Sequence, residues 1–544
     1  MDSTAARINI KHFQLLTSWA LMAFALPVWS LWCSVAAAAV GLALFWHASF
    51  SFPRPFWIAV WWFFAVQLVQ IHWLASSEYM GLGIYAVYIG LALAIGVQFG
   101  WLTQLLHRSV SFLSILGASG FWIIMEWLRT LPLTGFTWNP IGLSLTATDY
   151  SMQFASIFGV YGLSFWVIFT NVLALRALQK KNSLGLWAVC ACFPYCFGWM
   201  QLIYNEPDLV SQRPLYAALV QTDLKPEEKD YVEERSASYI IPLKQWENIL
   251  SYFVNTKQSR FDLIVMPEGT VPWAINKMGY LYEDVLQVWI SVFGSESVSA
   301  LPPMQLPFAR QSASGRWWVS NAFWAQGLAN YYRSEIVIGL LSAERKQTYN
   351  SAYYFRPRSD FIARYDKQIL VPLGEYVPLE KWQAFSGFVA DRFGIGSSFQ
   401  SGKEPKIFEG LFSLGISICS EEAYSDLIRR IRLLGAELFV NLSNDVWFPE
   451  TTLPEQHYLH SKIRAAENGV CVLRACNKGV TGVIDCFGRE LARLDKDSGV
   501  LVVQLPVATF STPYVFWGDI PMLLFSFILT PLWLFVTFKK KKLL

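Results

Sequence analysis

The feature that most constrains this chain is a succession of apolar runs between Phe13 and Ile203. Each run has about 17–25 residues, the length that an α-helix needs to cross the hydrocarbon core of a bilayer. The composition agrees, because 54% of the residues are hydrophobic and only 15% are charged, which is more apolar than a typical soluble protein. The pattern predicts eight membrane-spanning helices, at about 13–30, 31–49, 55–73, 81–105, 113–128, 153–175, 184–203 and 516–538.

The basic residues between these runs predict the orientation of the chain. One predicted side of the membrane carries most of them, and Arg129 alone falls on the other side; the first set is Arg7, Lys11, Arg54, Arg108, Arg176, Lys180, Lys181 and the lysines at 539–542. The positive-inside rule places this first set in the cytoplasm, with both termini. The long segment before the last span is then extracytoplasmic. A net charge of only +3, with scattered basic residues, argues against a nucleic-acid-binding surface.

The segment 205–514 differs from its flanks and predicts a separate α/β domain between a seven-span part at 1–204 and a last helix with a basic tail at 515–544. It alternates short β-rich runs with helix-like stretches, as α/β domains do. The predicted strands are 215–220, 263–266, 336–341, 414–418, 438–441 and 470–473, and the predicted helices include 230–253 and 455–468.

Three of the predicted strands end near reactive side chains, which are Glu268, Lys367 and Cys419. The carboxyl ends of strands are where α/β proteins place their sites. A single buried Cys is more often a small apolar residue, and a single Lys or Glu is more often a surface charge. Together they form a plausible reacting group, because a thiol with a pKa near 8.5 needs a base or a cation to become a nucleophile at neutral pH.

The remaining cysteines and histidines do not predict a metal site or a disulfide framework. Four cysteines lie inside apolar runs, and Cys471, Cys476 and Cys486 show no CxxC pairing. His457 and His460 follow Glu455 without a further ligand at zinc spacing, a pattern more typical of structural side chains. We therefore expect no metal ion and no organic cofactor.

The segments around the reactive residues carry a family resemblance. Residues 370–379 follow Lys367 with two prolines and a glycine, and the segments 441–448 and 474–481 are similarly distinctive. The stretch 217–488 resembles the nitrilase superfamily of carbon–nitrogen hydrolases, and more specifically the apolipoprotein N-acyltransferase family, to which residues 126–136 are also similar. This resemblance implies an αββα sandwich outside the cytoplasm.

The resemblance also implies roles for individual residues. Cys419 would be the nucleophile, Glu268 the general base and Lys367 the stabiliser of the oxyanion; supporting or substrate-binding roles would fall to Glu375, Ser420, Glu421 and Trp447. Two positions depart from the family pattern. Ser420 stands where a tyrosine is usual, and a Lys-Trp pair early in the domain reads Lys229-Asp230. These departures affect substrate contacts more than the chemistry.

The function that the resemblance implies is acyl transfer in the bacterial inner membrane, with a periplasmic catalytic domain. A phospholipid such as phosphatidylethanolamine would donate an acyl chain, through a cysteine thioester, to the N-terminal amine of a diacylated apolipoprotein. Two alternatives remain open from the sequence. One is a membrane-anchored amidase that uses the same three residues with water as the acceptor, and the other is a non-catalytic transporter or receptor.

Two aromatic stretches are each compatible with a core helix or with a lipid entry. The first follows Pro378 and the second precedes the predicted strand at 336–341; their members are Trp382, Phe385, Phe388 and Val389, and Trp317, Trp318, Phe323 and Trp324. Near-helical spacing of apolar residues is typical of both a core-facing stripe and an amphipathic interfacial segment.

Overall fold

A computed structural model describes residues 3–106, 110–205, 214–231, 233–345, 347–378, 387, 398–494 and 498–542. The chain divides into two compact units, which are described separately. The helical unit comprises Met1–Pro207, Glu450–Gly469 and Ser511–Leu544, and the catalytic unit comprises Asp208–Pro449 and Val470–Phe510. The boundaries at 204/205 and 514/515 stay a sequence-based prediction, and the segment Glu450–Gly469 groups with the helices.

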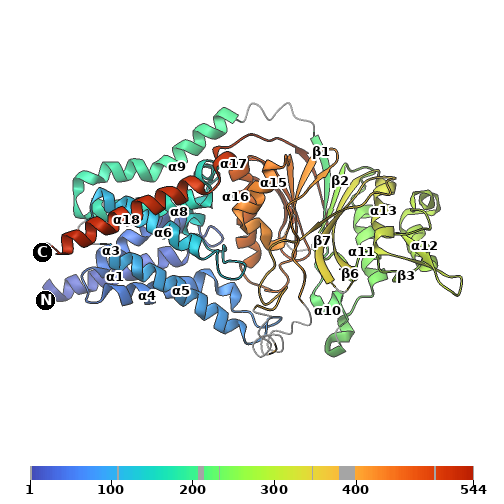
Figure 1. Ribbon diagram of the computed structural model, residues 1–544, viewed down its shortest axis with the longest axis horizontal. Helices are drawn as coiled ribbons and strands as arrows, with labels where there is room; N and C mark the ends of the chain where they lie inside the picture. Colours follow the sequence, from blue (N-terminus) through green and yellow to red (C-terminus); the bar gives the residue numbers. More distant parts are fainter. Residues whose placement is uncertain are drawn as a thin grey trace. The chain divides into compact units, whose positions relative to one another are not determined.

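Every apolar run that was predicted to span a membrane coincides with a helix or a chain of helices (Figure 1). Within the described residues, five stretches are long and apolar enough to cross a bilayer, which are Leu31–Ser49, Ile84–Leu105, Ala155–Gln179, Lys181–Asn205 and Ile520–Lys539. Two further apolar helices, Pro55–Gln70 and Phe112–Leu128, are shorter. The prediction of several apolar helices that could span a membrane is thereby confirmed.

The helical unit contains these elements: α1 (Ser3–Ala23), α2 (Leu31–Ala36), the π-helix η1 (Ala37–Gly41), α3 (Leu42–Ser49), α4 (Pro55–Gln70), η2 (His72–Leu74), α5 (Ile84–Leu105), α6 (Phe112–Leu128), η3 (Ile141–Ala147), α7 (Asp149–Met152), α8 (Ala155–Gln179), η4 (Lys181–Ser183), α9 (Leu184–Asn205), α16 (Leu453–Asn468), α17 (Pro513–Trp517) and α18 (Ile520–Lys542). The first run was predicted to continue to residue 30, but α1 ends at Ala23. Pro27 follows, and a proline cannot continue the hydrogen-bond ladder of a helix. Ser30 then caps α2 by accepting a hydrogen bond from the Cys33 N–H.

Close backbone approach and one buried amide organise the helical core. A Cβ at Gly117 in α6 would lie 2.3 Å from the Trp533 side chain of α18, so only glycine permits these two helices to pack as they do. Asn171 of α8 accepts a hydrogen bond from the Leu42 N–H at 2.8 Å and donates to the carbonyl of Ala38 at 2.9 Å. These bonds satisfy backbone groups that the π-helical turn η1 leaves without regular partners.

Helix α16 packs inside the helical unit although it follows a strand of the catalytic unit in sequence. The Glu467 Oε1 accepts a hydrogen bond from the Val160 N–H at 2.7 Å, where Gly159 takes a positive φ of 63° within α8. Arg464 Nη2 donates to the same oxygen at 3.0 Å, and Gln456 donates to the Gln70 carbonyl at 2.9 Å. The prediction of a helix at 455–468 is confirmed.

The catalytic unit is built on two six-stranded sheets within the described residues, in the orders β15-β1-β2-β6-β7-β8 and β14-β13-β12-β11-β10-β9. All six predicted strands are confirmed. The strands are β1 (Pro214–Gln221), β2 (Leu263–Met266), β6 (Glu335–Glu344), β7 (Gln347–Phe355), β8 (Ala363–Asp366), β9 (Ile407–Glu409), β10 (Ser413–Ile418), β11 (Leu438–Ser443), β12 (Cys471–Cys476), β13 (Thr481–Ile484), β14 (Glu490–Leu494) and β15 (Gly499–Pro506). A small third sheet contains β3 (Tyr280–Leu281), β5 (Trp317–Val319) and β4 (Ala309–Gln311).

Helices cover the outer faces of the two stacked sheets, so the unit has the predicted αββα order. Helices α11 (Pro242–Asn255) and α13 (Asn321–Tyr332) lie beside β2 and β6 in Figure 1, and α12 (Tyr282–Phe293) lies beyond them. Trp246 of α11 stacks on Trp324 of α13, with ring centroids 5.5 Å apart. On the other sheet, α15 (Ser425–Leu433) packs against β10, and strands β1 and β2 face β12 and β11 between the helix layers.

Two expectations for this unit are corrected. The predicted helix at 230–253 is interrupted, because the chain forms α10 (Pro226–Lys229), η6 (Glu233–Ser238) and then α11, which starts at Pro242. A proline favours the first turn of a helix and ends a preceding one. The lipid-entry interpretation is wrong for Phe323 and Trp324, whose side chains are fully buried in the core. The other candidate segment, with Trp382, Phe385, Phe388 and Val389, lies outside the described residues.

Candidate active site

The three reactive residues predicted from the sequence follow the ends of three strands in the catalytic unit. Glu268 lies two residues beyond β2, Lys367 follows β8, and Cys419 follows β10. Cys419 has a φ of 52°, in the left-handed region. That conformation costs about 1–3 kcal/mol for a residue with a side chain. It turns the chain sharply from the strand into the short helix η8 (Cys419–Ala423), so the thiol sits at a turn.

Lys367 is the centre of a buried charge cluster. Its side chain is 1% exposed, and Nζ donates to the Glu375 Oε1 at 2.8 Å and lies 3.4 Å from the Glu268 Oε1. Burial alone would lower the pKa of Lys367, but the charges of Glu268 and Glu375, with a contribution from Cys419, hold that pKa well above its usual range. The lysine is therefore a permanent cation between two carboxylates.

Asn350 completes this cluster from strand β7. Its Nδ2 donates to the Glu268 Oε1 at 2.6 Å and to the Glu375 Oε1 at 3.0 Å. The amide thus spans the same two carboxylates as the lysine, and its two hydrogen bonds fix their orientation. The backbone adds a further link, because the Lys367 N–H donates to the Asn350 carbonyl at 2.9 Å.

The Cys419 thiol lies within the field of this cluster. Burial raises the pKa of Cys419 well above its usual value, and the carboxylate of Glu268 raises it further. Lys367 acts in the opposite direction, and Asp445 and Glu375 add to the increase. The resting side chain is therefore a neutral thiol, and a neighbouring base must take its proton before the sulfur can react as a thiolate.

Glu421 links the turn at Cys419 to the segment around Lys367 by hydrogen bonds. Its Oε1 accepts hydrogen bonds from the Tyr365 hydroxyl at 2.8 Å and the Gln368 N–H at 2.7 Å, and its Oε2 accepts from the Ile418 N–H at 2.7 Å. Burial raises the pKa of Glu421 to about 7, against the opposing effect of these hydrogen bonds. Its contacts are with the protein, so the geometry gives Glu421 a supporting place.

The structure therefore brings Glu268, Lys367 and Glu375 into contact and puts Cys419 within the reach of their charges. Glu421 joins the residues next to Cys419 and Lys367 by hydrogen bonds. Ser420 is half-buried in η8 next to the nucleophile candidate. Trp447 lies on the segment after β11 and is 42% exposed, so it is not packed among the buried charges.

Sequence reasoning missed two groups of residues around the site. Asn350 is one, and its only signal was a polar residue inside an apolar strand. The other is a buried ion cluster in which Arg474 contacts Glu422 at 3.0 Å and Asp445 at 3.1 Å.

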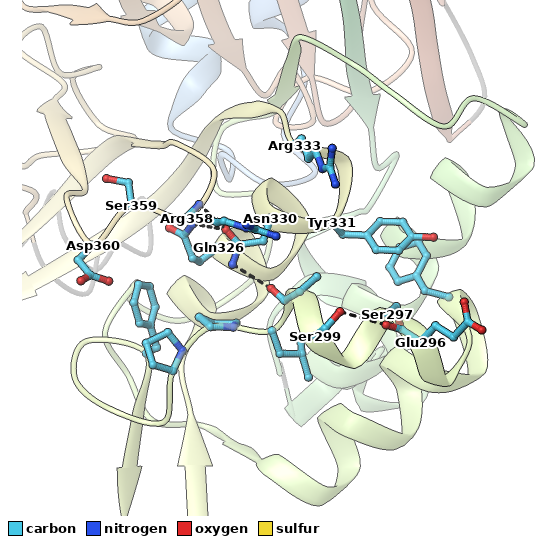
Figure 2. Close-up of a pocket in the computed structure, with 16 residues that line it drawn as sticks. Glu296, Ser297, Ser299, Gln326, Asn330, Tyr331, Arg333, Arg358, Ser359 and Asp360 are labelled. Atoms are coloured by element: carbon cyan, nitrogen blue, oxygen red, sulfur yellow. Dashed lines mark hydrogen bonds between the residues drawn. The ribbon is translucent and has the colours of Figure 1, made fainter.

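A surface pocket of about 590 Å³ elsewhere in the catalytic unit is separate from these residues (Figure 2). It lies between α12, η7 (Ser295–Ala300), α13 and the turn at 358–360. Figure 2 shows Arg358, Asn330 and Gln326 along one side of it. Glu268, Lys367 and Cys419 are absent from its described lining, so this pocket does not mark the candidate site.

Comparisons with known proteins match both parts of the chain. The family model described as carbon-nitrogen hydrolase matches residues 218–512, and the model described as apolipoprotein N-acyltransferase N-terminal domain matches residues 18–173. A Chlamydia pneumoniae protein called apolipoprotein N-acyltransferase is 31% identical over 95% of this chain and 96% of that protein. Proteins of the same name from Nitrosomonas europaea and Vibrio cholerae are 28% and 27% identical, over 77% and 78% of this chain and 74% and 76% of theirs.

Solved structures with similarity to the chain include two members of the nitrilase superfamily. Saccharomyces cerevisiae Nit3 is 16% identical, with a TM-score of 0.35, over 57% of this chain and 96% of that chain. An amidase mutant from Nesterenkonia AN1 is 18% identical, with a TM-score of 0.33, over 55% of this chain and 92% of that chain.

Proposed function

Since this chain belongs to the apolipoprotein N-acyltransferase family, we propose that it moves an acyl chain from a phospholipid, through a thioester on Cys419, to the N-terminal amine of a diacylated lipoprotein. The protein is an N-acyltransferase with apolar helices that could span a membrane. The observation that supports this chemistry best is the buried Lys367 ammonium between Glu268 and Glu375, in the field that acts on the Cys419 thiol.

The first half of the proposed cycle forms the thioester. Glu268 takes the proton of the Cys419 thiol while the sulfur attacks the ester carbonyl of the phospholipid. Negative charge then develops on the carbonyl oxygen, and the Lys367 ammonium stabilises it. When the tetrahedral intermediate collapses, the C–O bond breaks and Glu268 returns its proton to the leaving glycerol oxygen. The products are lysophospholipid and acyl-Cys419.

The second half transfers the acyl group. The neutral amine of the lipoprotein attacks the thioester carbonyl, Glu268 takes a proton from the amine nitrogen, and Lys367 again stabilises the oxyanion. The C–S bond breaks, the proton passes from Glu268 to sulfur, and the product is an amide. One carboxylate thus serves as base and acid in both halves, as a ping-pong reaction requires.

The helical unit fits this proposal, because both substrates carry lipid chains and stay in a bilayer. Holding them beside a tethered site reduces the entropy cost of bringing them together. We place the protein in the bacterial inner membrane, with the catalytic unit in the periplasm, on the distribution of its basic residues. The donor head group is proposed as phosphatidylethanolamine from the family resemblance.

The test uses purified full-length protein, phosphatidylethanolamine vesicles and a synthetic diacylated lipopeptide, read by mass spectrometry. We expect an added acyl mass on the peptide that contains Cys419, and a third chain on the lipopeptide. Cys419→Ala should lose both signals, while Cys192→Ala, which removes an exposed thiol of α9, should keep them.

A wild-type protein that remains unmodified by the phospholipid would contradict the proposal. An acyl-Cys419 that forms but passes its chain to water, leaving the lipopeptide unchanged, would support the amidase alternative instead. Retention of the third-chain product in Cys419→Ala would remove Cys419 from the mechanism.

A further inference from the structure

Arg474 lies at the centre of a buried ion cluster that the proposed mechanism does not use. Its side chain is fully buried on β12. Nε donates to the Glu422 Oε1 at 3.0 Å, Nη2 donates to the Asp445 Oδ2 at 3.1 Å, and Nη1 donates to the Val480 carbonyl at 2.5 Å. Each arm of the guanidinium therefore has an acceptor, the fork geometry that arginine offers and lysine does not.

The two carboxylates come from the two segments that border the reacting thiol. Glu422 is three residues beyond Cys419 in η8, and Asp445 is two residues beyond β11 and two before Trp447. Strand β12 lies parallel to β11, where Arg474 is opposite Asn441. Asn441 in turn donates from Nδ2 to the Cys419 carbonyl at 3.2 Å. Arg474 thus connects the turn that carries the nucleophile with the segment that carries Trp447.

The packing around Asp445 leaves that carboxylate little freedom. The Asp445 N–H donates to the Lys478 carbonyl at 3.0 Å, and the Cys476 Sγ lies 3.6 Å from the Asp445 Oδ2. A Cβ at Gly479 would lie 2.5 Å from the same oxygen, and Gly479 has a φ of 141°. Glycine at this position therefore allows the backbone to close over the carboxylate.

The charge of Asp445 matters because it acts on the Cys419 thiol. The charges with the largest effect on the pKa of this thiol are those of Glu268, Lys367, Asp445 and Glu375, and the three anions among them disfavour the thiolate. Arg474 sits against one of those anions and offsets its field. A buried ion cluster contributes little net stability compared with apolar residues of the same volume. The role of this cluster therefore follows from where it holds its side chains and how it balances their charges.

We propose that Arg474 is a positioning residue of this site, which holds Glu422 and Asp445 in place on either side of the Cys419 turn and neutralises Asp445. The inference rests on the proposed function, because it takes Cys419 as the nucleophile. The guanidinium does not touch the substrate; it acts through the two carboxylates. Removing it takes away the ion pair at 3.1 Å that offsets the charge of Asp445.

The test measures the Cys419 thiol directly in full-length protein, independent of acyl transfer. Iodoacetamide alkylation of the Cys419 peptide is followed by mass spectrometry from about pH 6 to about pH 10. Because the pKa of Cys419 lies well above its usual value, the alkylation rate rises with pH across this range. We expect Arg474→Met to raise that pKa by about one unit and so to lower the rate at about pH 8 roughly tenfold. Arg474→Met combined with Asp445→Asn should restore most of that rate, because both charges of the pair are then gone.

Arg489→Met is the matched control. Arg489 pairs with Asp485 at 2.6 Å in the same unit, and its removal should leave the alkylation profile of Cys419 unchanged. A folded Arg474→Met protein that is alkylated at the wild-type rate would overturn the proposal. If that variant does not fold, the isosteric change Asp445→Asn decides, because it should raise the alkylation rate and an unchanged rate would equally overturn the proposal. Failure of the proposed function would appear elsewhere, as acyl transfer that survives in Cys419→Ala.

Discussion

Lys367 is the side chain on which the chemistry of this site depends most directly. It is the cation with the largest effect on the pKa of Cys419, and two carboxylates, themselves bound by the Asn350 amide, fix its place. An ammonium in a site shielded from water stabilises a developing oxyanion far better than one in bulk solvent. The same burial makes the lysine costly to remove, because Glu268 and Glu375 would lose their shared counter-ion.

We predict that Lys367→Met lowers the rate of acyl-Cys419 formation by about 10²–10³-fold, the usual cost of losing one oxyanion donor. The rate is measured by mass spectrometry after mixing with phospholipid. Lys478→Met is the control, because the Lys478–Asp223 pair is about one third exposed and such pairs contribute about 1 kcal/mol or less. A Lys367→Met protein that is folded and acylates at the wild-type rate would exclude the oxyanion role.

The sequence identified those site residues whose neighbours along the chain carry a signal of their own. Glu268 and Cys419 each follow a strand that its own apolar residues predict, so their common location could be inferred. Lys367 follows β8, whose sequence Ala-Arg-Tyr-Asp has no apolar run, and it was identified from the distinctive segment that comes after it. Asn350 and Arg474 could not be found in this way. Each acts through partners distant in the chain, such as Glu268 for Asn350 and Glu422 for Arg474. The sequence pattern of their strands would be unchanged with another polar residue at either position.

Helix α16 is the element whose role was least visible in the sequence. Its helical period was evident, but the unit it packs into was not, because many of its buried side chains are polar and the chain around it forms strands. Its C-terminal turn carries a buried carboxylate, Glu467, that serves Val160 and Arg464 together. By contrast, the break before α11 could have been predicted from Pro242, a residue that starts helices more readily than it continues them.

We predict that Glu467→Ala destabilises the helical unit by about 3–5 kcal/mol, because the buried Arg464 loses this ion pair and the Val160 N–H loses its hydrogen bond to Glu467. Thermal unfolding in detergent, followed by tryptophan fluorescence, should show a lower midpoint. Glu455→Ala in the first turn of the same helix is the control and should change the midpoint little. Equal midpoints for Glu467→Ala and the wild type would show that this carboxylate does not hold α16 in place.

The molecule as a whole combines apolar helices that could span a membrane with a two-sheet enzyme domain. Every predicted span coincided with helical structure, because a run of apolar residues leaves the backbone no other way to satisfy its hydrogen bonds in a bilayer. The predicted side of the membrane for each loop depends instead on a few basic residues. The periodicity that predicts helices and strands carries no information about that side.

We predict that a thiol introduced by Ser314→Cys, in the exposed turn between β4 and β5, reacts with a membrane-impermeant maleimide in intact spheroplasts. Lys181→Cys, in the exposed turn η4 between α8 and α9, should react only after lysis. Labelling is read by a mass shift of each full-length variant, with the unmodified parent as background. The reverse pattern would place the catalytic unit in the cytoplasm.

The threading of α16 has a consequence for biogenesis. The chain leaves the sandwich after β11, contributes one helix to the other unit, and returns to supply β12 through β15. A ribosome must therefore release all of these segments before either unit has its full set of partners. If the sandwich were expressed without the first apolar helices, α16 would have no helices to pack against. Such a fragment should be recovered as inclusion bodies.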